Sequence, residues 1–319
     1  MEYQTKKHSI SRLELSFERI TKSEIDDLTL LFNEARNRKI SHSFFQKKYN
    51  TAWTGKENIA IVIKDQKGSI IGHLGVLPMY VTINNRVLLA GQISDAVLDP
   101  ILRGKNVFEQ LIIEVSELAR KEGLAYLFVS PSPQAVKGFE LANWKEVNHF
   151  RTYKIKVNTF PLNKIANKFS LSFAYRPFIR LMLSLSTKSD HNFNNSIFDS
   201  KTNSVSTSVD YVKHKNYTTN YLVRKNGFTF WFKIEDGIEI GNVSYFPPEK
   251  QNSFEKTIVH LAKLLGCHEV KVVTTRKTFL DTTFSNFPFI DGNKIFIKTF
   301  DIDEEFDSIV YNGSDFNTF

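Results

Sequence analysis

The chain has 319 residues, of which 41% are hydrophobic and 13% aromatic, which is enough apolar material for a large core and for two domains. Its single cysteine, Cys267, excludes an intramolecular disulfide framework and a cysteine-rich metal site, and no histidine has metal-ligand spacing to a partner, so we expect no bound metal. The residues that give the net charge of +8 are dispersed along the sequence, and no nucleic-acid-binding motif is visible. The sequence also shows no apolar run of about 18 residues and no signal sequence. These features predict a cytoplasmic protein without nucleic-acid or membrane partners.

The first half of the chain alternates short apolar runs with polar turns, in the order expected of an α/β domain. The predicted strands are Ile59–Ile63, Ile70–Val76, Tyr80–Ile83, Val87–Leu89, a strand that begins at Ile93, Leu124–Val129 and Tyr153–Val157. The first four strands form two hairpins, with turns at Lys64–Ser69 and Asn84–Arg86. A helix follows the strand at Ile93, and its apolar face is formed by Val107, Leu111, Val115 and Leu118.

The most informative segment is the basic loop that joins the strand at Ile93 to this helix. It contains Pro100, Arg103, Gly104 and Lys105. The first backbone N–H groups of a helix lack intrahelical partners, and together with the helix dipole they attract anions. We interpret the loop as a cradle for a phosphorylated cofactor; a basic turn without a ligand is the alternative.

This segment resembles motif A of the GNAT superfamily of acyl-CoA-dependent N-acyltransferases, which often reads Pro-x-x-Arg-Gly-Lys-Gly. The four residues of the loop match it as they stand, whereas Asn106 replaces the central glycine and Phe108 replaces a glycine or alanine. Asn is the non-glycine residue that best tolerates a left-handed backbone, so the first substitution is compatible with such a loop. The resemblance implies that the acyl-CoA is bound by Val97, Leu98, Arg103, Gly104, Lys105, Asn106, Val107, Phe108 and Ser132.

The resemblance extends over about residues 41–157. The segment Phe139–Val147 is similar, in order and spacing, to the pattern that follows the fifth strand of GNAT domains. It departs from the family where Phe139 aligns with the tyrosine that often serves as general acid, and where Ser132 stands near the position of a common asparagine. A mechanism in this chain must therefore work without a tyrosine acid at that position.

The second half of the chain repeats the order strand, strand, helix, strand without a basic glycine loop. The predicted elements are an apolar segment Phe169–Leu185 interrupted at Pro177, a polar connection Thr187–Ser208, the strands Tyr221–Val223, Gly227–Ile234, Gly237–Phe246, Val270–Val273 and Lys294–Phe300, and a helix Phe254–Leu265. We expect a GNAT domain with a central mixed sheet over residues 1–160, a helical and polar connection over 161–215, and a degenerate GNAT-like α/β domain over 216–319 that contributes to the acceptor site. An unrelated α+β domain is the alternative for the last part.

Attack of an amine on a thioester needs a route for the amine proton and backbone N–H donors at the thioester oxygen. The resemblance places these donors in the strand around Asp95–Leu98. The candidate bases are Asp95, Asp315 and His73. An unpaired carboxylate is costly in an apolar strand, so a structural role that pins a neighbouring loop is the alternative for Asp95. Asp315 lies in a C-terminal tail, and the aromatic residues of this tail predict that it packs against the protein. A histidine in the setting of His73 is more often a residue with structural hydrogen bonds than a base.

The resemblance implies a sugar N-acyltransferase of surface-polysaccharide synthesis, such as that of lipopolysaccharide O-antigen. Acyl-CoA is its co-substrate, with no permanently bound cofactor. The resemblance to two-domain GNAT relatives implies that the acceptor is a nucleotide-linked amino sugar such as a dTDP-amino-dideoxyhexose. Phe230, Trp231 or Tyr245 could stack on its base, and a place in the buried core is the commoner alternative for such residues. The alternatives are an acyltransferase of another small amine, a peptide or an aminoacyl-tRNA, and a catalytically inert GNAT-like scaffold. No oligomeric state is predicted.

Overall fold

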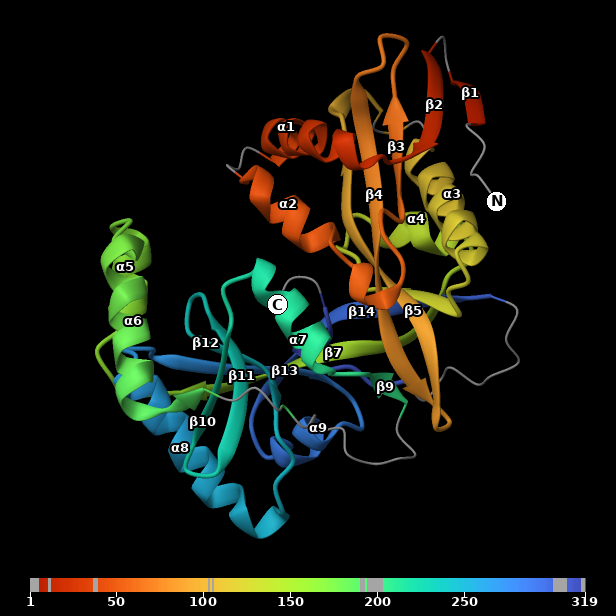
Figure 1. Cartoon of the computed structure of the whole chain (residues 1–319). Coiled ribbons are helices and arrows are strands. Elements are labelled where there is room, and N and C mark those ends of the chain that lie inside the picture. Colours follow the sequence, from red (N-terminus) through yellow and green to blue (C-terminus); the bar gives the residue numbers. More distant parts are fainter. Residues whose placement is uncertain are drawn as a thin grey trace. The chain divides into compact units, whose positions relative to one another are not determined.

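The computed structural model is a mixed α/β protein (Figure 1), and it describes residues 6–10, 13–36, 40–102, 104, 106–189, 193, 203–300, 309–316 and 319. The chain forms two compact units, each with its own hydrophobic core. The first unit consists of Met1–Thr82, Arg86–Val147 and Asn293–Asp307, and the second of Ile83–Asn85, Asn148–Gly292 and Ser308–Phe319. The α/β class expected from the sequence is confirmed, whereas both units are discontinuous and so differ from the contiguous ranges 1–160, 161–215 and 216–319.

The sheet of the first unit has the strand order β1–β2–β3–β4–β5–β6–β14. Its strands are β1 (Lys6–Ile10), β2 (Leu13–Arg19), β3 (Ala60–Lys64), β4 (Ile70–Ile83), β5 (Arg86–Leu98), β6 (Tyr126–Val129) and β14 (Phe289–Thr299). β1 to β4 pair antiparallel in succession, β5 pairs parallel with β6, and β14 pairs antiparallel with β6.

The β3–β4 hairpin agrees with the prediction, but β4 and β5 are longer than predicted. The segments Ile70–Val76 and Tyr80–Ile83 belong to one continuous strand, β4, in which Pro78 lies. The pairing of β3 with β4 ends at Gly75, so the missing N–H of Pro78 does not interrupt that ladder. Val87–Leu89 and the strand at Ile93 are likewise one strand, β5.

Helices cover both faces of the sheet of the first unit, with α1 and α2 on one side and α3 and α4 on the other (Figure 1). They are α1 (Ile25–Arg36), α2 (His42–Tyr49), α3 (Val107–Lys121) and α4 (Val136–Leu141). Alternation along β4 explains the two layers, because successive side chains of a strand point to opposite faces. Leu74 and Val76 belong to the core that includes α3, whereas His73 and Gly75 contact Tyr49 of α2.

The second unit contains β7 (Lys145–Lys156) from Asn148 onward, and its sheet has the order β7–β13–β12–β11–β10–β8. The further elements are α5 (Leu162–Lys168), α6 (Ser172–Ser186), β8 (Lys188–Ser189), β9 (Ser204–Val205), α7 (Val209–His214), β10 (Tyr221–Lys225), β11 (Phe228–Ile234), β12 (Ile238–Val243), α8 (Gln251–Leu264), β13 (Glu269–Thr275) and α9 (Phe279–Thr283). β12 and β13 pair parallel across α8, as β5 and β6 do across α3. The predicted repeat of element order is confirmed.

Three sequence predictions for the second half can be compared with the structure. The strand predicted at Lys294–Phe300 belongs to β14 and pairs with β6 of the first unit. Pro177 does not interrupt the helix, because α6 runs through it and Ile179 and Leu183 anchor the following turns in the core. The tail packs as predicted, with the side chains of Tyr311, Phe316 and Phe319 buried. Much of the connection 187–208 lies outside the described residues.

Candidate functional site

β5 and β6 part from one another after a short stretch of parallel pairing. Within the described strands the paired residues are Gly91 with Leu127 and Gln92 with Phe128. Gly91 permits this approach, since a Cβ there would lie 2.8 Å from Cδ2 of Leu127 on β6. β5 continues to Leu98, so Val97 and Leu98 lie on the part of β5 that is not paired with β6. Backbone groups that face the β6 side of this strand end can hold a ligand.

The turn from β5 into α3 combines a short 3₁₀ helix, Pro100–Leu102, with two left-handed residues. Gly104 has φ of 73° and Asn106 has φ of 56°, and both are exposed. The left-handed conformation that makes Asn a compatible substitute for glycine is thus present at Asn106. Arg103 and Lys105 lie outside the described residues. Val107 begins α3 with a fully buried side chain, and the backbone N–H groups of the first helical turn lack intrahelical partners.

We expect the backbone conformation of Asn106, rather than its side chain, to matter for the turn, because its side chain makes no capping hydrogen bond to α3. Asn106→Gly should leave the free energy of unfolding within a few tenths of a kcal/mol of wild type, whereas Asn106→Ala should lower it by about 1 kcal/mol. Urea denaturation of both variants checks this. Equal losses in the two would show that the side chain is the important part.

Three further residues that the GNAT resemblance singles out, Phe108, Ser132 and Phe139, contact other parts of the protein. Phe108 lies against Phe139, with ring centroids 5.8 Å apart, and a Cβ at Gly138 would lie 2.6 Å from its ring. Phe139 is buried and also contacts Trp144. Ser132, beyond the end of β6, is exposed, and its carbonyl accepts from the N–H of Ala135.

Asp95 lies within β5 but has a left-handed backbone conformation, at φ of 56°. Its carboxylate accepts hydrogen bonds from Nζ of Lys48 at 2.8 Å and from the hydroxyl of Tyr49 at 3.0 Å, two residues at the end of α2. The Lys48 side chain is 3% exposed and that of Asp95 13%. Burial alone would raise the pKa of Asp95, but the Lys48 ammonium holds this pKa below its ordinary value. Asp95 is therefore ionised and paired.

His73 on β4 is fully buried beneath α1 and α2, where the rings of Phe32 and Tyr49 each pack against it in a T-shaped arrangement. Its Nδ1 lies 2.8 Å from the main-chain oxygen of Asp95, which can only accept, so Nδ1 carries the proton. Nε2 has no hydrogen-bond partner among the described residues. Burial lowers the pKa of His73 to about 4, so the ring is neutral at pH 7.

Asp315 lies in the second unit, in the short 3₁₀ helix Gly313–Asp315, and is fully buried. Its Oδ2 accepts from the backbone N–H of Asn312 at 2.8 Å. Nζ of Lys215, also buried, donates to the carbonyl of Phe316 and holds the tail from the other side. Burial raises the pKa of Asp315 to about 7, although the Asn312 N–H and the Lys215 charge oppose this.

The raised pKa makes the stability of the protein depend on pH. Between about pH 4 and 7 the folded state keeps the proton of Asp315 while the unfolded state loses it, so stability falls as pH rises through this window, by at most about 1.4 kcal/mol per pH unit. Asp315→Asn retains an acceptor and removes the titration. Its free energy of unfolding, relative to wild type, should rise by about 2 kcal/mol between pH 5 and pH 7 in urea denaturation. A difference that stays constant over this range would contradict the assignment.

Two of the aromatic residues expected to stack on a nucleotide base are not accessible. Phe230 and Trp231 are completely buried in the second unit, and the indole N–H of Trp231 donates to Asn220. Because core packing already uses both rings, the expectation is wrong for them. Tyr245 is 47% exposed and contacts Phe279.

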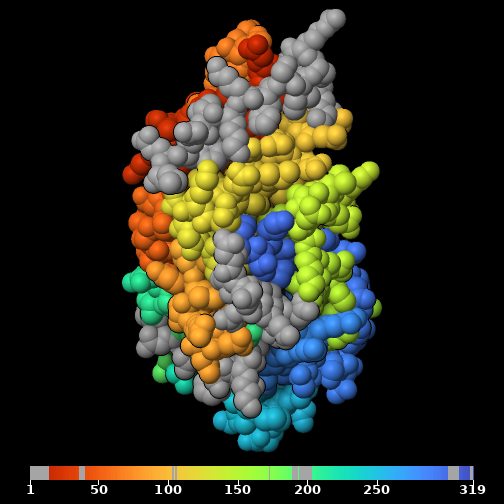
Figure 2. All heavy atoms as spheres, turned by 90° about the vertical axis from the view of Figure 1, so that its right-hand side faces the viewer, coloured from red at the N-terminus to blue at the C-terminus, as the bar shows by residue number. Residues whose placement is uncertain are grey.

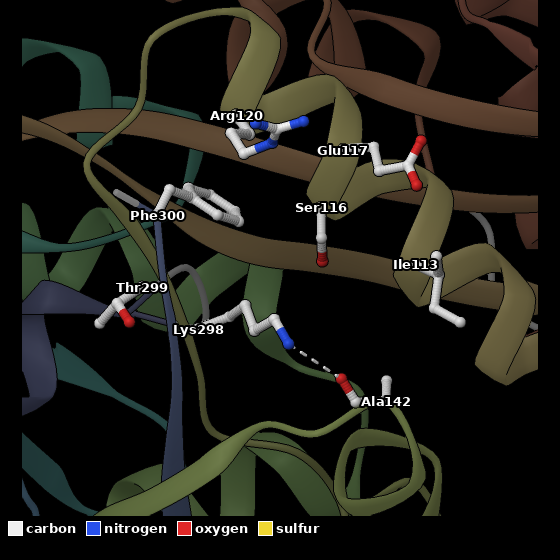
Figure 3. Close-up of a pocket in the computed structure, with 8 residues that line it drawn as sticks. All are labelled: Ile113, Ser116, Glu117, Arg120, Ala142, Lys298, Thr299 and Phe300. Carbon is white, nitrogen blue, oxygen red and sulfur yellow. Dashed lines mark hydrogen bonds between the residues drawn. The ribbon is translucent and has the colours of Figure 1, made fainter. Parts of the chain in front are cut away.

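A cavity of about 390 Å³ lies in the first unit, away from the β5–α3 turn. It is lined by Ile113, Ser116, Glu117, Arg120, Ala142, Lys298, Thr299 and Phe300 (Figure 3). Nζ of Lys298 donates to the carbonyls of Ala142 and Asn143 on one side of it. The space-filling view shows these elements on one face, with β14 between α3 and the segment that contains α4 (Figure 2). None of the expected acyl-CoA residues lines this cavity.

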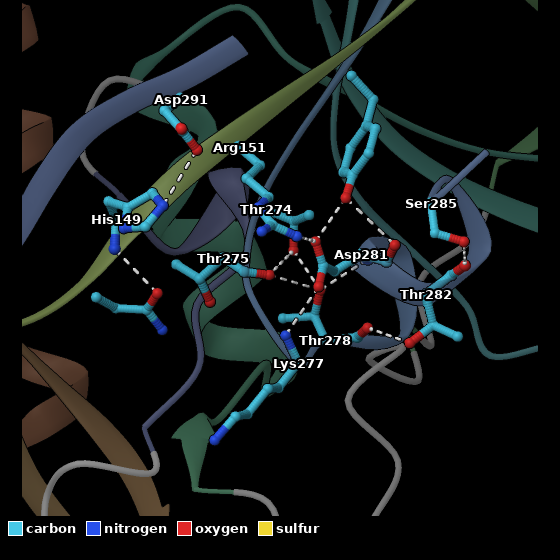
Figure 4. A network of polar contacts seen from close by, with 12 residues as sticks. His149, Arg151, Thr274, Thr275, Lys277, Thr278, Asp281, Thr282, Ser285 and Asp291 are labelled. Carbon is cyan, nitrogen blue, oxygen red and sulfur yellow. Dashed lines mark hydrogen bonds and ion pairs between the residues drawn. The ribbon is translucent and has the colours of Figure 1, made fainter. Parts of the chain in front are cut away.

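A polar network in the second unit centres on Asp281 of α9 (Figure 4). Arg151 and Tyr153 of β7 both bind its Oδ1, at 3.0 Å and 2.6 Å, and the backbone N–H of Lys277 binds its Oδ2. The carboxylate is thus used to join α9 to β7. Among the described residues, no group of three or more His, Cys, Asp or Glu side chains is placed to hold a metal ion, and no helix is long and apolar enough to cross a membrane.

Lys48 and Tyr49 are the residues of the site that the sequence did not reveal. Lys48 follows Lys47 in a short amphipathic helix, and nothing in the sequence distinguishes the buried lysine from its exposed neighbour. One signal was present: the cost of an unpaired carboxylate in β5 requires a cationic or donor partner for Asp95. The partner lies 47 positions away in the sequence.

Comparisons with known proteins give one family-model match and several similar solved structures. Residues 16–141 match the family model described as Acetyltransferase (GNAT) domain. A search of curated protein sequences found no match. Among solved structures, a GCN5-related N-acetyltransferase from Kribbella flavida is similar with a TM-score of 0.60 at 10% identity, over 91% of this chain and 72% of that one.

Two further solved structures resemble the fold over most of the chain. A probable N-acyltransferase from Enterococcus faecalis has a TM-score of 0.56 at 12% identity, over 89% of this chain and 72% of that one. Saccharomyces cerevisiae N-myristoyltransferase with bound myristoyl-CoA has a TM-score of 0.55 at 12% identity, over 91% of this chain and 83% of that one. Residues 16–141 therefore match the model of a GNAT acetyltransferase domain, and the fold over most of the chain is similar to that of these solved N-acyltransferases.

Proposed function

We propose that this protein transfers the acyl group of an acyl-CoA to the amine of a nucleotide-linked amino sugar. The main support for acyl-CoA as the donor is the turn between β5 and α3. In this turn Gly104 and Asn106 adopt left-handed conformations directly before a helix N-terminus. The neighbouring structure of yeast N-myristoyltransferase contains an acyl-CoA, which supports this co-substrate. The acceptor follows from the sequence resemblance to two-domain sugar acyltransferases.

In this proposal Arg103, Lys105 and the first N–H groups of α3 bind the phosphates of coenzyme A. The end of β5 at Val97 and Leu98, which is not paired with β6, holds the thioester, with a backbone N–H group directed at the oxygen that becomes negative in the tetrahedral intermediate. The amine nitrogen attacks the carbonyl carbon, the carbon–sulfur bond breaks, and the thiolate leaves. A thiol with pKa near ~8.5 leaves without an acid, which agrees with a phenylalanine at position 139.

The amine proton passes to water in this scheme. Asp95 is paired with Lys48 and has a lowered pKa, and His73 is enclosed and has a pKa of about 4, so both are poor proton acceptors at pH 7. Asp315 has the most suitable pKa but is fully buried. We therefore assign Asp95 and His73 to holding the backbone of β5, and Asp315 to holding the tail.

A thermal-shift panel tests the proposal with acetyl-CoA, longer and hydroxylated acyl-CoAs, UDP and dTDP. At a ligand concentration of 100 times Kd, binding stabilises the folded state by about 2.7 kcal/mol, which is a readily measured shift in Tm. We expect stabilisation by an acyl-CoA and by dTDP. Stabilisation by an acyl-CoA but not by dTDP would support an acyltransferase with another amine acceptor, such as a peptide or aminoacyl-tRNA. No response to any thioester would leave a scaffold without acyltransferase activity.

A further inference from the structure

A left-handed aspartate within a strand needs an external restraint, because non-glycine residues rarely adopt this conformation and a strand does not favour it. Asp95 is such a residue in β5, three positions before Leu98. Its main-chain oxygen is bound by Nδ1 of His73, and its two carboxylate oxygens are bound by Lys48 and Tyr49. Backbone and side chain of Asp95 are therefore restrained from β4 and from α2 together.

The partners on α2 are themselves fixed. Lys48 is almost completely buried, with its ammonium 5.5 Å from the centre of the Phe44 ring. Tyr49 is stacked with Phe45 and lies over Gly75 of β4, where a Cβ would come within 2.3 Å of the tyrosine oxygen. The absence of a side chain at Gly75 is thus what allows the hydroxyl of Tyr49 to reach Asp95.

We propose that Lys48 and Tyr49 are positioning residues for acyl transfer: they hold Asp95 in its left-handed conformation and thereby fix the peptide groups of Val97 and Leu98. This inference rests on the proposed function, in which those peptide groups receive the thioester. A change of direction in the backbone at Asp95 sets the orientation of the residues that follow, as a bulge does in a strand. Neither Lys48 nor Tyr49 needs to touch substrate for this role.

Three variants distinguish the effect of the backbone conformation of Asp95 from the effect of its carboxylate charge. Tyr49→Phe removes one hydroxyl, while Asp95→Gly and Asp95→Ala both remove the carboxylate and only glycine adopts the left-handed conformation without cost. We expect kcat to fall about 5-fold in Tyr49→Phe, about 10-fold in Asp95→Gly and about 100-fold in Asp95→Ala, with KM for acetyl-CoA changed less than about 2-fold, because the misplaced donors act in the transition state. Tyr153→Phe is the matched control, since that hydroxyl also binds an aspartate but in the second unit.

Hydrogen–deuterium exchange supplies a readout that does not depend on turnover. Peptides covering residues 93–98 should exchange about 10-fold faster in Tyr49→Phe and Asp95→Ala than in wild type, and at the wild-type rate in Tyr153→Phe. Unchanged exchange and kcat in both site variants overturn the proposal, and so does Asp95→Gly being as impaired as Asp95→Ala, which would make the carboxylate itself the essential group. If Asp95→Ala does not fold, Tyr49→Phe decides. Wild type that neither binds nor consumes acetyl-CoA refutes the proposed function instead, while the exchange comparison still decides the role of Tyr49.

Discussion

Replacing Arg103 and Lys105 together by alanine should weaken the binding of acetyl-CoA by about 100-fold. Each cation that contacts a phosphate contributes on the order of 1.5 kcal/mol, and a total of about 3 kcal/mol corresponds to a factor of about 100 in Kd. The helix N-terminus and the backbone of Gly104 remain in the variant, so residual affinity is expected. Isothermal titration calorimetry with acetyl-CoA at fixed ionic strength measures the change.

A charge-matched control lies at the other end of the same helix. Arg120→Ala with Lys121→Ala removes the same charge from the last turn of α3 and should change Kd less than about 3-fold. Equal losses in the two double variants would mean that net charge, not the β5–α3 turn, attracts coenzyme A. An unchanged Kd in the Arg103 and Lys105 variant would contradict the assignment of the turn to phosphate binding.

Lys48→Met should lower the free energy of unfolding by about 3–5 kcal/mol, because it leaves the buried carboxylate of Asp95 without its cation. The double variant Lys48→Met with Asp95→Asn removes both charges and should recover most of that loss. Asn also tolerates the left-handed backbone at position 95. Urea denaturation of the two variants and of wild type gives the comparison.

Lys64→Met is the control for this loss within the same unit. Lys64 pairs with Glu18 and Glu24 at 2.6 Å, but its side chain is 19% exposed, so water can replace the contact and the loss should stay below about 1 kcal/mol. A loss of similar size in both lysine variants, or a double variant no more stable than Lys48→Met, would contradict the view of Lys48 and Asp95 as a buried ion pair.

The local secondary structure around the β5–α3 turn was predictable, because residues that are neighbours in the sequence determine it. The apolar periodicity of α3, its start at Val107 and the left-handed tolerance of Asn106 all follow from a short stretch of sequence, and the structure agrees with each. The parallel pairing of β12 and β13 across α8 follows in the same way from a strand–helix–strand pattern.

Contacts between distant segments were not predictable in this way. The strand at Lys294–Phe300 has the composition of any buried strand, and only its register with β6 shows that it belongs to the first unit. The role of Asp95 required a partner from α2 and a glycine on β4, which no local pattern connects. Aromatic residues such as Phe230 and Trp231 occur both in surfaces that stack on a nucleotide base and in hydrophobic cores. Only their burial in the structure shows that these two belong to a core.

The central claim is acyl transfer from coenzyme A to a sugar amine, and mass spectrometry of a reaction mixture tests it most directly. Protein, acetyl-CoA and a dTDP-amino-dideoxyhexose are incubated, and acetylated sugar and free coenzyme A are quantified. The proposal predicts one free coenzyme A for each acetylated sugar, with both products strongly reduced in the Arg103→Ala and Lys105→Ala double variant. Bound acetyl-CoA that is never consumed, with this sugar and with a panel of other amines, would contradict it.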